Sequence, residues 1–227
     1  METIFSGDRK SYTVFIDLDH TIISKISGKL LAVNAIKKGF AKPSGILRVL
    51  IQYLLYKTGA VDPQAMAGKM ISWTKGMHES KMRELCLETA EDLLVPSIYN
   101  EAVNEIEMHR NKGAAIVLLS ASLIDVCNKI SERIRIDEVI CTTLESKDGY
   151  LTGEAKSGLC FGEEKSKRLR DYCLKNNINA SESWYYGDSN SDLPVFYSVG
   201  IPVCVNPGRM LRKKAAENGW KILNWTH

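Results

Sequence analysis

The stretch VFIDLDHTII, residues 14–23, decides the fold of this chain. It begins as an apolar strand and then presents two carboxylates, Asp17 and Asp19, separated by one residue. Aspartate is a poor strand former and is costly to bury without partners. Two such residues at the end of an apolar strand therefore indicate the edge of a sheet, where the strand leaves the core.

Short apolar runs rich in β-branched or aromatic residues recur along the chain, and amphipathic stretches of helical length separate most of them. This alternation predicts an α/β fold, a doubly wound, Rossmann-like parallel sheet with helices on both faces. An Asp-Gly turn within 147–154 predicts a small hairpin between the third strand and its helix. The expected strands are 12–16, 114–119, 138–144, 183–187 and 201–205, and the expected helices are 100–112, 123–133, 162–176 and 211–218.

Residues 22–95 break this alternation. We expect them to form a helical cap inserted after the first strand, with residues 1–21 and 96–227 forming the core. Within the cap, residues 43–59 are apolar on most sides, which predicts a buried helix, with contact to lipid or to an apolar substrate as the alternative. An insert at this point lies above the carboxyl ends of the strands, where open α/β sheets bind their ligands.

The net charge of the chain is +3, but its distribution is uneven. Residues 22–78 hold nine lysine or arginine residues and one acid, hence +8, which leaves −5 for the remainder. Such a segment is either a solvated basic face or a surface that attracts an anionic substrate or membrane. A nucleic-acid partner is not expected, because the segment lacks an aromatic stacking platform and any known reading motif.

The composition, 44% hydrophobic and 25% charged, is that of a folded chain and excludes general disorder. Six scattered cysteines without a C-x-x-C pair predict reduced thiols. No apolar run reaches the roughly 18 residues of a membrane span, and the first residues lack the layout of a secretory signal. We therefore expect a cytoplasmic protein with no transmembrane segment. Nothing in the sequence indicates an oligomeric state.

Polar side chains follow four of the expected strands. Parallel strands deliver their carboxyl ends to one edge of the sheet, so residues far apart in sequence can converge there. Carboxylate oxygens suit Mg²⁺, and a lysine and a hydroxyl beside the metal would offset the charge of a phosphoryl group. The pattern therefore predicts Mg²⁺-dependent phosphoryl transfer. The residues are, in chain order, Asp17 with Asp19, Ser120, Lys165, and Asp188 with Asp192.

These residues resemble the four motifs of the haloacid dehalogenase superfamily, particularly its phosphoserine phosphatase-like branch (subfamily IB). The motif D-x-D-x-T is matched by residues 17–21, the hydroxyl motif by Ser120, the basic motif by Lys165 and the acidic motif by residues 187–192. The likeness covers nearly the whole chain. It implies a phosphoric monoester hydrolase with a capped α/β core. The alternatives are a phosphotransferase or phosphomutase that uses the same intermediate, and a catalytically inactive binding protein.

The resemblance also implies a role for each acid. Asp17 would be the nucleophile that forms an aspartyl-phosphate, and Asp19 the general acid and base. Mg²⁺ would be held by Asp17, by the backbone carbonyl of Asp19 and by Asp188. Asp192 would act beside the metal, by orienting Lys165 or a metal-bound water.

The phosphate-binding groups implied by the resemblance are the hydroxyl of Ser120, the backbone N–H of Ala121 and the ammonium group of Lys165. Lys165 is assigned by its register in the basic motif, and Lys167 and Arg168 are its competitors.

The substrate is expected to be a small phosphomonoester, but not phosphoserine. Phosphoserine phosphatases carry a glutamate soon after the first motif that recognises the substrate's amine, whereas the next acid here after Asp19 is Asp62. The basic, apolar cap predicts a strongly anionic or lipid-bearing phosphate instead. His20 is expected to be a passive linker, and His78 and His109 are expected at the surface.

Overall fold

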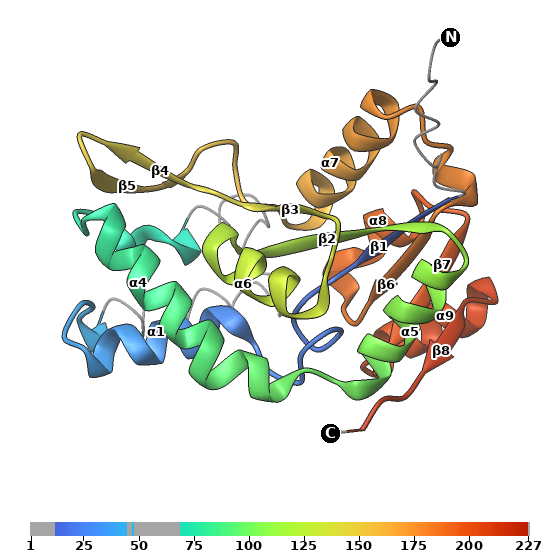
Figure 1. The fold of residues 1–227 in the computed structure, drawn as a ribbon, viewed down its shortest axis with the longest axis horizontal. Coiled ribbons are helices and arrows are strands. Elements are labelled where there is room, and N and C mark those ends of the chain that lie inside the picture. The colour runs from blue at the N-terminus through green and yellow to red at the C-terminus, as the bar shows by residue number, and fades with distance from the viewer. Residues whose placement is uncertain (1–11, 45–46, 48–68, 227) are drawn as a thin grey trace, which may run out of the picture.

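The computed structural model describes residues 12–44, 47 and 69–226. Its core is a six-stranded, wholly parallel sheet in the order β3-β2-β1-β6-β7-β8 (Figure 1). The five expected strands are all present, which confirms the predicted fold class. The sixth, β8, escaped the sequence analysis because it is a three-residue edge strand. The strands are β1 (Tyr12–Ile16), β2 (Ala114–Leu123), β3 (Glu138–Thr142), β6 (Trp184–Gly187), β7 (Ile201–Val205) and β8 (Lys221–Leu223).

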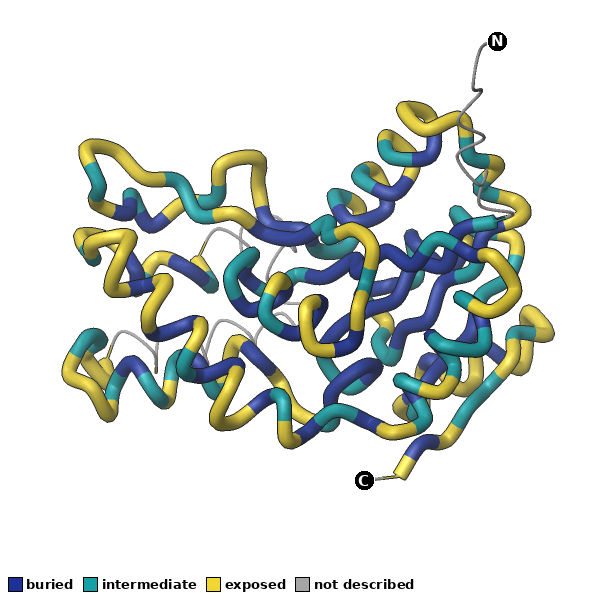
Figure 2. Tube along the Cα trace, viewed as in Figure 1, coloured by how far each residue is buried: buried dark blue, intermediate teal, exposed yellow. Residues whose placement is uncertain are grey.

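Helices cover both faces of the sheet. Along β1, Val14 and Ile16 belong to the apolar cluster that contains α5 and α6, whereas Phe15 belongs to the cluster that contains α7, α8 and α9. Alternate residues of a strand point to opposite faces, so a β1 buried on both sides is the mark of a doubly wound sheet. Figure 2 shows the strands as a mostly buried layer. The helices are α5 (Asn100–Asn111), α6 (Ile124–Ile134), α7 (Gly162–Lys175), α8 (Leu193–Phe196) and α9 (Arg209–Asn218).

Strand β2 is longer than the sequence indicates. It continues to Leu123, where it pairs with Thr142 of β3 after a break in register that begins at Leu119. Ser120 therefore lies within the irregular end of the strand and not after it. An irregularity of this kind changes the direction of side chains at the edge of a sheet. Here it lies next to the residues that follow β1.

The segment between β1 and α5 contains the helices α1 and α4, which lie at the left of Figure 1 beside the carboxyl ends of the strands. Pro96, expected as the point of return to the core, lies in a single turn of 3₁₀-helix. The predicted helix at 43–59 falls almost wholly outside the described residues. The described elements of this segment are α1 (Ser27–Lys37), η1 (Ser72–Thr74), α4 (Glu79–Thr89), η2 (Ala90–Leu94) and η3 (Val95–Ser97).

The predicted hairpin is confirmed as the antiparallel strands β4 (Leu144–Lys147) and β5 (Tyr150–Ala155). Its turn residues, Asp148 and Gly149, both have positive φ angles, 51° and 79°. Two such residues form the tight turn whose twist matches that of a hairpin, and Asp-Gly adopts it at low cost.

The hairpin also pairs with the segment that precedes α4. The backbone N–H of Gly76 donates to Leu151 O at 2.8 Å, and the N–H of Leu151 donates to Met77 O at 2.9 Å. The hairpin after β3 and the insert after β1 are thus joined by backbone hydrogen bonds, a contact between distant segments that no local pattern predicts.

His109 is buried, with 1% of its surface exposed, so the expectation of a surface position was wrong. It lies in the last turn of α5, where it continues the buried stripe of Ala102 and Ile106. Its Nδ1 lies 2.8 Å from Tyr12 Oη and its Nε2 lies 2.7 Å from Tyr186 Oη.

The direction of these hydrogen bonds follows from Glu105. Tyr186 Oη–H donates to Glu105 Oε2 at 2.9 Å, so it accepts from Nε2–H of His109, and Nδ1 accepts from Tyr12. A neutral imidazole with its proton on Nε2 satisfies this network, so the folded chain does not need the charged form.

We predict that His109 makes the fold sensitive to acid. Burial lowers the pKa of His109 below its ordinary value. As the pH falls, His109 is therefore protonated in the unfolded chain before it is protonated in the folded chain. Its contribution to stability is present above the pKa of histidine in the unfolded chain and is lost as pH falls below about 6.5. The free energy of unfolding, measured in urea, should therefore fall more steeply between pH 7.5 and 5.5 in the wild type than in His109→Gln. Parallel pH profiles for the two proteins would contradict this.

Candidate active site

Asp17 is delivered to the carboxyl edge of the sheet by the pairing of β1 with β6. Its backbone N–H donates to Tyr186 O at 2.9 Å, which continues the pairing one residue beyond Ile16. Asp17 lies two residues after Phe15 and therefore shares the face of the sheet that α7 covers. The residue is only 7% exposed, so its carboxylate needs partners within the protein.

Lys165 provides one partner for Asp17. It is 2% exposed and belongs with Leu169 and Cys173 to the buried stripe of α7, at i, i+4 and i+8. Its Nζ lies 2.8 Å from Asp17 Oδ1 and 2.8 Å from Asp192 Oδ1. The same Nζ lies 5.4 Å from the ring centroid of Tyr185, within cation–π range.

The competitors of Lys165 point elsewhere. Lys167 is exposed and pairs with Asp171 on the same helix. The guanidinium group of Arg168 donates to the backbone oxygens of Ser157 and Gly158, in the connection that precedes α7, and to that of Cys141. Of these three basic residues, only Lys165 contacts Asp17 and Asp192, whereas Arg168 pairs with Glu164 on its own helix.

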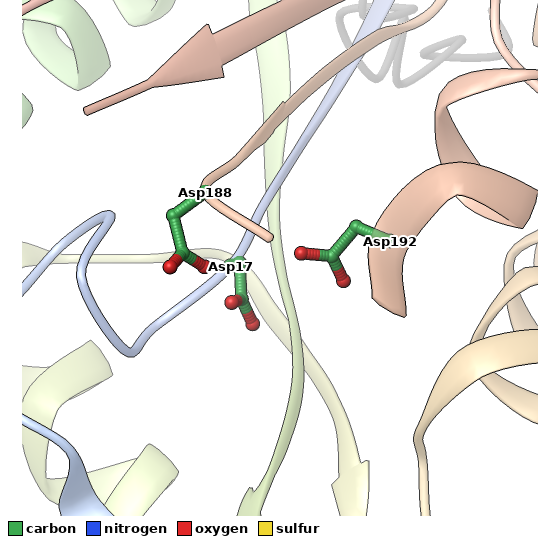
Figure 3. Close-up of side chains that lie close together, drawn as sticks. All are labelled: Asp17, Asp188 and Asp192. Carbon is green, nitrogen blue, oxygen red and sulfur yellow. The ribbon is translucent and has the colours of Figure 1, made fainter. Parts of the chain in front are cut away.

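Three of the predicted acids converge. The carboxylates of Asp17, Asp188 and Asp192 each offer an oxygen within 4.8 Å of the others (Figure 3). Asp188 directly follows β6, and Asp192 ends the short 3₁₀ turn η5 (Asn190–Asp192). The hydroxyl of Ser189 donates to Asp192 Oδ2 at 3.1 Å, a supporting contact that the sequence analysis did not identify.

Asp19 is close in sequence but does not share this cluster. Its carboxylate Oδ1 accepts a hydrogen bond of 2.9 Å from the backbone N–H of Ser27, the first residue of α1. The side chain of Asp19 is thus separate from the three grouped carboxylates, and its backbone carbonyl is the group that the resemblance assigns to a metal. The contact with Ser27 was missed, because no sequence signal links Asp19 to a helix eight residues later.

Ser120 is buried at the irregular end of β2. Its Oγ accepts a hydrogen bond of 3.2 Å from the backbone N–H of Ser122. Ala121 is held in place by Thr142, whose hydroxyl donates to Ala121 O at 2.8 Å. The pairing of Ile16 with Leu118 places Ser120 on the strand next to Asp17, near the same edge.

Burial dominates the titration of the acids. It raises the pKa of Asp188 to about 9, with the charges of Asp192 and Asp17 adding to the effect. It raises the pKa of Asp17 to about 7 although Lys165 opposes the change, and that of Asp19 to about 6 although Ser27 opposes it. Burial lowers the pKa of Lys165, but the carboxylates outweigh this and hold it above its ordinary value, so Lys165 stays charged.

The arrangement fits a hard divalent cation. One ammonium group, that of Lys165, faces the three grouped carboxylates, so the ionised cluster is negative overall and a cation would neutralise it. Clustered carboxylate oxygens at a sheet edge are the donor set that Mg²⁺ takes.

Comparison with known proteins identifies the family. A model of the haloacid dehalogenase-like hydrolases matches residues 14–196. The chain is 31% identical over 215 residues to the "Inhibition of morphological differentiation protein" of Streptomyces azureus, covering 93% of this chain and 77% of that protein. It is 28% identical over 224 residues to a probable phosphatase of Mycobacterium tuberculosis, covering 97% and 78%.

Among solved structures, a phospho-aspartyl intermediate analogue of phosphoserine phosphatase superposes with a TM-score of 0.69 at 19% identity, covering 94% of this chain and 93% of that chain. This likeness shows the fold. The chain belongs to the haloacid dehalogenase-like hydrolase family. Within it the chain is a phosphatase, a phosphoric monoester hydrolase, that resembles phosphoserine phosphatase. None of the described helices has the length and apolar character to cross a membrane.

We predict that Mg²⁺ binding releases about one proton per site at pH 7.5, because Asp188, with a pKa of about 9, must lose its proton to become a ligand. Affinity should therefore weaken as the pH falls from 9 towards 6. Calorimetric titration with MgCl₂ in two buffers of different ionisation enthalpy measures the release. Asp188→Asn should abolish it, and equal heats in both buffers for the wild type would contradict the prediction.

Proposed function

We propose that this chain is a Mg²⁺-dependent phosphatase that hydrolyses a phosphomonoester through an aspartyl-phosphate on Asp17, with Asp19 as general acid and base. The observation that supports this most directly is the bridge made by Lys165. Its ammonium group contacts Asp17 and Asp192, and these two acids and Asp188 bring their carboxylates within 4.8 Å of one another.

The residues that would hold Mg²⁺ are Asp17, Asp188 and the backbone carbonyl of Asp19, with Asp192 beside the metal. When bound, the cation supplies electrostatic stabilisation to the charge that develops on the phosphoryl oxygens. Lys165 would stabilise the same oxygens, and so would the hydroxyl of Ser120 and the backbone N–H of Ala121.

In the first step a carboxylate oxygen of Asp17 attacks phosphorus. A bond forms from Asp17 to phosphorus, the ester bond from phosphorus to the leaving oxygen breaks, and Asp19 gives its proton to that oxygen. Asp17 sits at the end of β1 with little freedom to move, which favours a reproducible line of attack.

In the second step Asp19, now ionised, takes a proton from water while the water oxygen attacks phosphorus. The bond from Asp17 to phosphorus breaks, and inorganic phosphate and the free carboxylate are the products. A pKa of about 6 lets Asp19 exist in both protonation states near neutral pH, as a residue with both tasks requires.

We also propose that the insert, residues 22–95, acts as a cap over a core of 1–21 and 96–227. The bond from Ser27 to Asp19 supports this, because it brings the first helix of the insert to the catalytic edge. The backbone pairing between Leu151 and Met77 supports adding the hairpin to the cap. Closure of such a unit would exclude water from the intermediate.

For the substrate we propose a strongly anionic or lipid-bearing phosphate. In the described part of the insert, the exposed lysines Lys25, Lys29 and Lys37 lie on or next to α1. Ile26, which is exposed among them, directly precedes the residue that binds Asp19. A leaving group near Asp19 would therefore lie close to the apolar Ile26, and the lysines of this helix would attract it from a longer distance. The cytoplasm is the proposed location, since all six cysteines are free thiols.

We predict that Asp17→Asn abolishes phosphate release, by at least roughly 1,000-fold, because an amide cannot act as the nucleophile. Phosphate release should be measured with and without Mg²⁺ on phosphoserine, sugar phosphates, nucleotides, phosphocholine and lysophosphatidic acid. Turnover that persists in Asp17→Asn would refute the aspartyl-phosphate. Release that occurs only with an added acceptor would favour a phosphotransferase, and Mg²⁺ binding without any release would favour a binding protein.

We predict that Lys37→Glu raises KM for the most anionic substrate of that panel about threefold and leaves kcat unchanged. The reason is that the charge of Lys37 attracts the substrate from a distance and takes no part in the chemical step. The difference should disappear at high salt. Lys175→Glu, an exposed charge reversal at the far end of α7, is the matched control. An equal change in KM for both variants would show that the charge of the cap does not contribute to specificity. The same expectation includes Lys38 and Arg48. Lys38 pairs with Glu88, and Arg48 lies outside the described residues.

A further inference from the structure

Ser27, the first residue of α1, makes two contacts with the catalytic edge of the sheet. Its backbone N–H donates to Asp19 Oδ1 at 2.9 Å, and its Oγ–H donates to Ser122 Oγ at 2.9 Å. Ser27 itself is 1% exposed, and both hydrogen bonds are partly buried. Ser122 in turn donates its backbone N–H to Ser120 Oγ at 3.2 Å. Ser27 is thereby connected to both Asp19 and Ser120.

The backbone of α1 explains why Asp19 turns towards it. The first N–H groups of a helix have no partner within the helix, and its N-terminus carries partial positive charge. Ile26, at the N-cap of α1, has no side-chain acceptor for these groups. The carboxylate of Asp19 takes that place, and it is supplied by the loop that leaves β1.

The hydrogen bond from Ser27 also keeps the carboxylate of Asp19 away from the three grouped acids. Asp17, Asp188 and Asp192 group their carboxylates within 4.8 Å, and a fourth one among them would add repulsion between like charges. The N–H of Ser27 holds the carboxylate of Asp19 apart from that group. Asp19 can give its proton to the leaving oxygen only if its carboxyl group stays outside the group of acids.

We propose that Ser27 is a positioning residue for the reaction: its N–H orients the carboxylate of Asp19, and its hydroxyl fastens α1 to Ser122 so that the N–H stays in place. The proposal rests on the proposed function, because it takes Asp19 as the proton donor. A displacement of α1 would break both hydrogen bonds at once, so the position of this helix and the orientation of the Asp19 carboxylate are coupled.

The substitutions Ser27→Ala and Ser27→Pro separate the two contacts. Alanine removes the hydroxyl and keeps the N–H. Proline removes both, at the first position of a helix, where its ring is tolerated and no helical hydrogen bond is lost. The extended conformation of Ile26, with φ −103° and ψ 109°, suits a residue before proline.

The measurement is kcat/KM for propyl phosphate, whose leaving group needs a proton, and for 4-nitrophenyl phosphate, whose leaving group does not. This parameter reports the step in which the ester bond breaks. Ser27→Pro should lose roughly 100-fold on propyl phosphate and only a few-fold on 4-nitrophenyl phosphate, since a positioned general acid contributes about that factor. Ser27→Ala should lose about threefold to tenfold, again mainly on propyl phosphate.

Asp19→Asn sets the reference, because it should show the same selective loss. Ser80→Ala, an exposed serine on α4, is the matched control and should change neither substrate. Equal losses on both substrates in Ser27→Pro would mean general damage to the site and would overturn the proposal. So would full activity on propyl phosphate.

A double-mutant cycle tests the hydroxyl contact and remains decisive if Ser27→Pro does not fold, as judged by thermal unfolding. Ser27→Ala and Ser122→Ala remove the same hydrogen bond, so the double variant should lose no more than either single one. Fully additive losses on propyl phosphate would overturn the proposal.

Asp17→Asn in the same assay separates the two levels of inference. Turnover of both substrates by Asp17→Asn refutes the proposed function itself. If Asp17→Asn is inactive and Asp19→Asn shows the selective loss while Ser27→Pro does not, only the role of Ser27 is refuted.

Discussion

The structure depends on the charge balance around one buried ammonium group. The Nζ of Lys165 lies 2.8 Å from carboxylate oxygens of both Asp17 and Asp192, and all three residues are buried. Buried ions are tolerated only when they are paired, and removing one partner costs about 3 to 5 kcal/mol because the remaining charge is left uncompensated. This constraint ties the end of β1, the first turn of α7 and η5 together. It also leaves an excess of acid at the sheet edge, which suits the site to a cation.

The sheet topology explains why the insert after β1 and the hairpin after β3 lie above the site of Lys165. Strands β1 and β3 lie on either side of β2 in a parallel sheet, so the connections that leave their carboxyl ends rise from the same edge. The insert after β1 and the hairpin after β3 meet there, where Met77 and Leu151 share backbone hydrogen bonds. The first helix of the insert reaches down to Asp19. The sheet therefore brings both segments to the edge that holds Asp17 and Asp19.

Much of the fold could be predicted from local patterns. Alternating apolar runs and amphipathic stretches gave five strands and four helices within a few residues, and Asp-Gly marked the hairpin. The errors have physical causes. Strand β8 is short and lies at the edge, and β2 continues through an irregularity that only its pairing with Thr142 maintains. His109 was expected at the surface because histidine is polar, whereas two tyrosine hydroxyls satisfy it inside the protein.

The sequence by itself determined which chemical groups are present and in what order, because motif residues and strand ends can be read locally. It indicated Asp17, Asp188, Asp192 and Lys165, and the resemblance to the family's basic motif favoured Lys165 over Lys167 and Arg168. Only the tertiary structure decided how these groups meet: that Lys165 bridges two acids, that Asp19 turns to Ser27, and that Ser27 also reaches Ser122. The reason is that each such contact joins side chains or backbone groups from different elements. Their separation is set by the packing of those elements, and no periodicity within one segment contains that information.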